Sequence, residues 1–137
     1  MTDDKKYQEA LARRREVLGD SYVDGAIARE DGFNAPIQRF LTENIWGDVW
    51  GRGTLTRRER SFLTLAVLMA TNRPAELRLH LMAARRNGCS IDEIREVLIH
   101  VSAYCGAPAA VDAMKQVNEV LADEIETAGM TGSRRKP

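Results

Sequence analysis

Cysteine is scarce in this chain, and the placement of its two cysteines excludes several kinds of site. Cys89 and Cys105 are the only two in 137 residues. They are far apart, so they form neither a CxxC motif nor the spacing of a metal site. The N-terminal residues are charged where a secretory signal needs an apolar segment. We therefore expect two reduced thiols and a cytoplasmic protein.

Long apolar runs and an excess of either charge are also missing. The longest apolar run covers residues 62–70, which is about half of what a helix needs to cross a membrane. The 20 basic and 20 acidic side chains balance, whereas nucleic-acid binding normally requires a concentrated basic excess. The basic cluster near the C-terminus, at residues 134–136, is short. We expect neither a nucleic-acid nor a membrane partner.

Helical periodicity without strand-like alternation predicts an all-α protein of six to seven helices. We expect one helical domain over residues 1–126 and a disordered tail over 127–137. Capping boxes at 56–59 and 90–93 predict two of the helix starts. The expected helices cover residues 7–18, 21–30, 36–45, 57–71, 74–87, 91–104 and 109–126.

The segment W-G-D-V-W-G-R-G, residues 46–53, separates two of these helices. Its three glycines predict a loop or a frayed helix end. Trp46 and Trp50 must bury their rings somewhere. They can plug a helix bundle, or they can form a pocket wall with Arg52 pointing inward, and the two interpretations are compatible.

Two expected helices are apolar on more than one side. Apolar residues surround the helix at 57–71 and occupy both sides of the helix at 91–104. Such helices need cover on several sides, which favours a homo-oligomer. His100, between Glu96 and Tyr104 on the second helix, is interpreted as structural or interfacial.

The helix at 74–87 carries the strongest candidate for chemistry. Glu76 and His80 share a narrow arc with Ala83 and Asn87, between apolar flanks. The pair can be a structural contact that locks the helix. It can also be an acid/base group whose tautomer and pKa are set by the carboxylate. The chain offers no phosphate loop, metal-ligand cluster or serine nucleophile with partners as a rival.

Several motifs together resemble a known family. They are the tryptophan segment, R-S-F-L-T-L-A at 60–66, R-P-A-E-L-R-L-H at 73–80 and Y-C-G-A-P-A-A at 104–110. The chain resembles the carboxymuconolactone decarboxylase family, and within it the decarboxylase branch. The resemblance implies an all-helical fold shared with alkylhydroperoxidase D, assembled as trimers or hexamers. In the peroxidase branch a CxxC precedes the shared histidine. Arg73 and Glu76 stand in those positions here, so thiol peroxidase activity is not expected.

The activity that the resemblance implies is cofactor-free decarboxylation of 4-carboxymuconolactone to the 3-oxoadipate enol-lactone. This reaction belongs to protocatechuate breakdown by the β-ketoadipate pathway. Neither a cofactor nor a metal is expected, because the lactone carbonyl of the substrate accepts the electrons. The expected carboxylate-binding residues are Arg52, Arg60 and Arg73. His80 suits proton delivery or contact with the oxyanion, and we expect it to be the proton donor. Glu76 would orient it, and the two tryptophans would keep the site dry.

Other readings of the sequence stay open. A related lactone or keto-acid decarboxylase, or an isomerase, would use the same pocket with different arginines. A non-catalytic helical oligomer would have a closed helix face and no cavity at His80. The sequence alone does not assign each arginine to a carboxylate.

Overall fold

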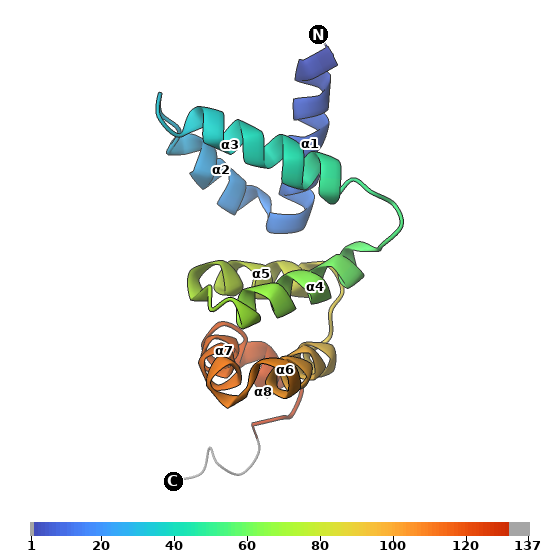
Figure 1. The fold of residues 1–137 in the computed structure, drawn as a ribbon, viewed down its shortest axis with the longest axis vertical. Coiled ribbons are helices and arrows are strands. Elements are labelled where there is room, and N and C mark those ends of the chain that lie inside the picture. Colours follow the sequence, from blue (N-terminus) through green and yellow to red (C-terminus); the bar gives the residue numbers. More distant parts are fainter. Residues whose placement is uncertain (1, 132–137) are drawn as a thin grey trace. The chain divides into compact units, whose positions relative to one another are not determined.

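The computed structural model describes residues 2–131, which form helices and contain no strand. They divide into two compact units, one ending at Arg60 and the other beginning at Ser61, and each unit is described by itself (Figure 1). The predicted all-α class is confirmed. Between residues 2 and 131, no helix is long and apolar enough to cross a membrane. Of the predicted tail, residues 132–137 lie outside the described residues.

The number of helices is slightly higher than the six to seven predicted, because eight α-helices and one π-helical segment are present among the described residues. The expected helix at 109–126 is interrupted at Leu121, whose φ of −107° and ψ of 22° leave the helical region. The elements of the first unit are α1 (Thr2–Leu18), α2 (Asp20–Ala28), α3 (Ala35–Leu41) and the π-helix η1 (Thr42–Val49). The remaining helices are α4 (Arg57–Ala70), α5 (Pro74–Arg86), α6 (Ile91–Cys105), α7 (Ala107–Val120) and α8 (Ala122–Thr127).

Both predicted capping boxes are confirmed. At the start of α4, the backbone N–H of Glu59 donates to Thr56 Oγ1 at 3.1 Å, and the Thr56 N–H donates to the Glu59 carboxylate at 2.9 Å. Ser90 and Glu93 exchange the same two bonds before α6. These bonds satisfy backbone N–H groups that a helix start otherwise leaves unpaired. The starts of the two helices are thus fixed by local sequence.

The tryptophan segment, predicted to be a loop or a frayed helix end, is the end of a helix that becomes irregular after Val49. Residues up to Val49 continue α3 as a π-helix, in which the Trp50 N–H donates to the Ile45 carbonyl five residues earlier, at 2.8 Å. Glycine allows close packing instead of breaking the helix, since a Cβ on Gly47 would lie 3.2 Å from the Cβ of Ala10 on α1. Between η1 and the start of α4 at Arg57, residues 50–56 are irregular.

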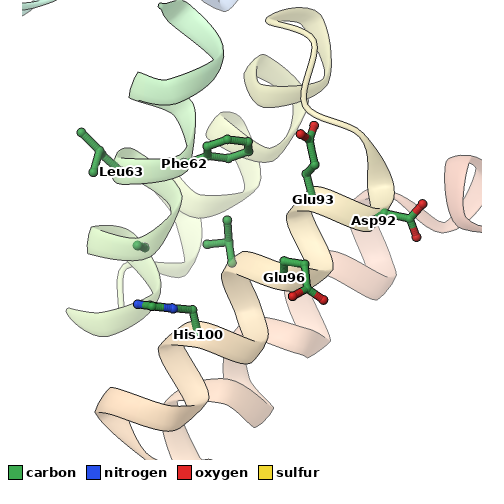
Figure 2. A pocket seen from close by; sticks show the side chains of 8 residues that line it. Phe62, Leu63, Asp92, Glu93, Glu96 and His100 are labelled. Carbon is green, nitrogen blue, oxygen red and sulfur yellow. The ribbon is translucent and has the colours of Figure 1, made fainter. Parts of the chain in front are cut away.

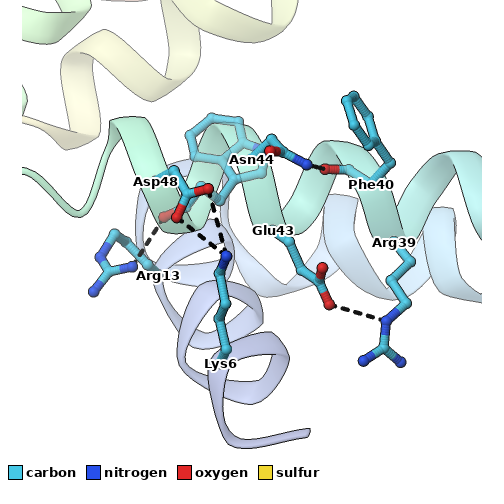
Figure 3. Close-up of polar contacts among 8 residues, drawn as sticks. Lys6, Arg13, Arg39, Phe40, Glu43, Asn44 and Asp48 are labelled. Carbon is cyan, nitrogen blue, oxygen red and sulfur yellow. Dashed lines mark hydrogen bonds and ion pairs between the residues drawn. The ribbon is translucent and has the colours of Figure 1, made fainter. Parts of the chain in front are cut away.

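Polar contacts hold η1 against α1 (Figure 3). Arg13 Nη1 donates to the Trp46 carbonyl oxygen at 2.9 Å, and Lys6 forms an exposed ion pair with Asp48 at 3.4 Å. The Arg13 bond is partly buried and satisfies a carbonyl of the π-helix from outside. Exposed pairs such as Lys6–Asp48 contribute little, about 0–1 kcal/mol. The Arg13 bond is therefore the more important of the two contacts.

The second unit has an apolar core that α4 to α8 share. Exposure within α4 is uneven, because Leu65 and Met69 are buried whereas Leu63 and Val67 are more than half exposed. The sequence predicts that α4 is covered on every side, and a single chain does not cover all of its sides. The buried cluster consists of Leu65, Met69, Leu77, Leu81, Ala84, Cys89, Ile94, Val101, Ala113 and Leu121.

We predict that Gly51→Ala destabilises the protein. A Cβ at this position would collide with the carbonyl oxygen of Gly47 and lie 3.0 Å from Arg13 Nη1. Overpacking of this kind typically costs about 1–3 kcal/mol. Urea unfolding measures the change. Gly53→Ala is the matched control, because nothing lies within 4 Å of a Cβ there, and equal stability of the two variants would contradict the account of the segment.

Candidate functional site

His80 lies on the half-buried face of α5, and its side chain is 11% exposed. Glu76, one turn earlier, is 59% exposed, and its Oε2 lies 3.8 Å from His80 Nε2. That distance is too long for a hydrogen bond, so the two side chains are neighbours in the fold. The predicted control of the His80 tautomer by Glu76 stays a prediction.

Burial lowers the pKa of His80 from 6.5 to about 4. The cause is desolvation, which disfavours the charged imidazolium. His80 is therefore a neutral imidazole near pH 7, with one ring nitrogen carrying a hydrogen and the other a lone pair. A neutral ring can donate a hydrogen bond to a developing negative charge, but it is a poor source of a free proton.

Two further residues of the second unit frame α5. Arg73 is the exposed N-cap residue of the helix, and its backbone N–H donates to the Leu68 carbonyl at 3.0 Å. At the other end, Asn87 Nδ2 donates to Ser61 Oγ at 3.0 Å, and Ser61 is buried. This bond ties α5 to α4. The helical periodicity predicts Asn87 on the His80 face, whereas its partner Ser61 becomes visible only in the fold.

The tryptophans of the first unit form a packed pair. Trp46 and Trp50 are 6% and 8% exposed, and their ring centroids are 5.2 Å apart with planes tilted by 35°. Their burial agrees with the prediction that both rings are covered. Whether they also form a pocket wall stays a prediction.

Arg52 and Arg60 come together in the first unit. Arg60 Nη2 donates to the backbone carbonyl of Arg52 at 3.2 Å, and the Arg52 side chain is exposed. Arg60 thus fixes the backbone that carries Arg52. The predicted site residues therefore form two groups. Trp46, Trp50, Arg52 and Arg60 belong to the first unit, and Arg73, Glu76 and His80 belong to the second.

The first unit holds one further functional candidate, Arg14, which is not among the predicted site residues. Arg14 is 7% exposed and lies on the buried face of α1 with Ala10, Val17 and Leu18. The spacing 10, 14, 17 and 18 is that of one helix face, so the signal was present in the sequence. It was missed because an arginine in a charged helix is usually solvated.

An open apolar groove of about 500 Å³ lies between α4 and α6 in the second unit. Figure 2 shows Phe62 and Leu63 on α4, with His100 on α6 at one end and acidic residues at the other. His100 stacks on Tyr104 at 4.8 Å, and Tyr104 is 79% exposed. None of the seven predicted site residues lines this groove.

Within residues 2–131, no cluster of three or more histidine, cysteine or acidic side chains could hold a metal ion. Both cysteines are free thiols, Cys89 buried and Cys105 exposed. A family model described as "Carboxymuconolactone decarboxylase family" matches residues 35–119. The chain belongs to this family. The predicted resemblance is thereby confirmed.

Two similar proteins cover most of the chain, and a third covers about a third of it. A protein named 4-carboxymuconolactone decarboxylase from Acinetobacter baylyi is 42% identical over 123 residues, 90% of this chain and 92% of the relative. Nitrosuccinic acid decarboxylase npaB from Metarhizium robertsii is 37% identical over 120 residues, 88% of this chain and 84% of the relative. A Pseudomonas putida 4-carboxymuconolactone decarboxylase is 33% identical over 48 residues, 35% of this chain and all of the relative.

We predict that burial of His80 makes this family member sensitive to mild acid. The folded pKa of about 4 lies below the ordinary value of 6.5, so the unfolded chain takes up a proton first as pH falls. The stability contribution is complete above about pH 6.5 and is lost toward about pH 4. Between about pH 7 and about pH 5 the loss should be about 2 kcal/mol.

Urea unfolding at the two pH values measures this loss. In His80→Gln the position no longer titrates, so this variant should lose about 2 kcal/mol less than the unchanged protein over the same interval. His100→Gln is the matched control and should retain the sensitivity. The same pH dependence in the unchanged protein and in His80→Gln would show that His80 is not desolvated.

Proposed function

We propose that this protein decarboxylates 4-carboxymuconolactone to the 3-oxoadipate enol-lactone. The observation that carries the proposal is the 42% identity, over 90% of the chain, to a protein named for this activity. The buried and neutral His80 supports it, because the reaction needs a hydrogen-bond donor in a dry place. The protein is then a carboxy-lyase that takes a small lactone dicarboxylate.

The substrate supplies its own electron sink. One carboxylate sits on the ring carbon γ to the lactone carbonyl. When its C–C bond breaks, CO2 leaves and the electron pair moves through the ring double bond into the carbonyl, which gives a dienolate. The α carbon then takes up one proton, which comes from solvent in the net reaction. No cofactor is required by this sequence of bond changes.

His80 is best suited to stabilise the negative charge on the lactone oxygen. Of the two roles expected for it, the lowered pKa favours the oxyanion contact over delivery of a proton from the imidazolium. Glu76 would orient the ring, and the tryptophan pair would keep water away. The exposed Arg52 and Arg73 would attract the dianionic substrate, with Arg60 holding the backbone of Arg52.

A second candidate function is decarboxylation of nitrosuccinate. It is favoured by the relative of that name, which is 37% identical over 88% of this chain. Nitrosuccinate is also a dicarboxylate, and loss of CO2 beside its nitro group leaves a charge that the nitro group accepts. The two candidates therefore share an arrangement of two carboxylates next to an electron sink. They differ in the size and ring structure of the substrate.

We expect purified protein treated with a chelator to release CO2 from 4-carboxymuconolactone and to form the enol-lactone. His80→Ala should lower kcat about 100-fold, the typical effect of removing one oxyanion donor. His80→Gln should recover about tenfold of that loss, because its amide still donates a hydrogen bond. CO2 release and product formation measure both effects.

Three outcomes separate the alternatives. Full turnover by His80→Ala would remove His80 from the mechanism. Equal loss in His80→Ala and His80→Gln would favour an imidazolium proton donor over the oxyanion contact. Turnover of nitrosuccinate with a higher kcat/KM than carboxymuconolactone would replace the first candidate by the second.

We also propose that the chain works as a cytoplasmic trimer or hexamer. Large apolar side chains of the second unit are about half exposed in the single chain, which supports burial by another subunit. They include Leu63, Val67, Ile99, Val111 and Met114. Light scattering on the purified protein should give three or six times the 15.3 kDa chain mass, and a monomer at micromolar concentration would contradict this.

A further inference from the structure

Arg14 is a charged side chain in the middle of an apolar helix face. On α1 it lies between Ala10 and Val17, both of which are 0% exposed, and it is itself 7% exposed. Arginine is almost never this buried unless a partner offsets the loss of hydration. The question is therefore which group balances the charge of Arg14.

The described residues satisfy only a small part of this guanidinium. Nη1 donates to Thr42 Oγ1 at 3.0 Å, and Thr42 is 1% exposed. Arg14 Nε is buried and has no hydrogen-bond partner among residues 2–131. No carboxylate of the described residues pairs with Arg14, whereas its neighbour Arg15 pairs with Asp20 and Asp24. A guanidinium offers five N–H donors in a planar fork, and the hydrogen bond to Thr42 uses only one of them.

A buried cation without an acid partner destabilises a fold, and an apolar residue of the same size would serve the packing better. The position of Arg14 is close to the predicted site residues of the first unit. Its partner Thr42 begins η1, one helical turn before the buried Trp46. An anion that reaches this face of η1 would supply the charge that the fold leaves out.

We propose that Arg14 binds a carboxylate of the substrate, and specifically the one that the substrate keeps. This inference rests on the proposed function. An arginine paired with the departing carboxylate would stabilise the ground state and oppose the loss of its charge. A pairing with the retained carboxylate is the same before and after the C–C bond breaks, so it lowers KM and leaves kcat unchanged.

The test is Arg14→Met, which keeps the length of the side chain and removes the charge. KM for 4-carboxymuconolactone should rise on the order of 100-fold, as expected for truncating one partner of a buried charge pair. The kcat should stay within about threefold, and the urea midpoint should be equal or higher. Arg15→Met, at the next position of the same helix, is the matched control and should leave KM unchanged.

A substrate analogue sharpens the result. In this analogue the carboxylate that the substrate keeps is converted to a methyl ester, which removes the group that Arg14 binds. The unchanged protein and Arg14→Met should therefore have equal KM values for the analogue. A KM for the true substrate within about threefold of the unchanged protein would overturn the proposal. If Arg14→Met does not fold, Arg14→Lys takes its place. A KM raised about tenfold would then support the proposal, because lysine lacks the planar fork of arginine. An unchanged KM would overturn the proposal.

Failure of the proposed function gives a different pattern. If the unchanged protein releases no CO2 from carboxymuconolactone, that function is wrong. Arg14 is then tested with succinate as a simple dicarboxylate. Succinate should raise the unfolding temperature of the unchanged protein and not that of Arg14→Met, and equal behaviour of the two would overturn the role of Arg14.

Discussion

Desolvation of a few ionisable side chains is the constraint on which the rest of this structure depends. Each compact unit has one basic side chain that is largely buried: His80 on α5 is 11% exposed, and Arg14 on α1 is 7% exposed. Burial keeps the first neutral and leaves the second charged with one hydrogen bond. Both arrangements cost the fold stability. For Arg14, a bound carboxylate would bring the negative charge that the described residues of the first unit do not provide.

The packing around η1 follows from the same requirement for a dry interior. Gly47 allows the π-helix to lie against Ala10, and Arg13 satisfies the carbonyl of Trp46. The two tryptophan rings can then be buried side by side on a short segment. A wider helical turn presents side chains at positions that an α-helix does not, which is why π-helical turns often occur at functional sites.

Much of the fold could be predicted because its signals are local. The capping boxes at Thr56 and Ser90 and the break at Pro74 fix helix ends through neighbouring residues. The π-helix could not be predicted, since its glycine, Gly47, acts through contact with α1, far away in the sequence. The burial of Arg14 also depends on tertiary packing. The sequence indicated the family and, within the site, His80. The lowered pKa of His80 could not be predicted, because it depends on how the fold buries the ring.

The central claim is that His80 is held neutral and dry before the substrate arrives. The most direct measurement is an NMR titration of protein labelled with nitrogen-15 in histidine. The chain has two histidines, so His100→Gln assigns the signals. The account predicts that His80 stays neutral until pH approaches about 4. A titration midpoint near the ordinary value of 6.5 would show a solvated imidazole and would contradict the claim.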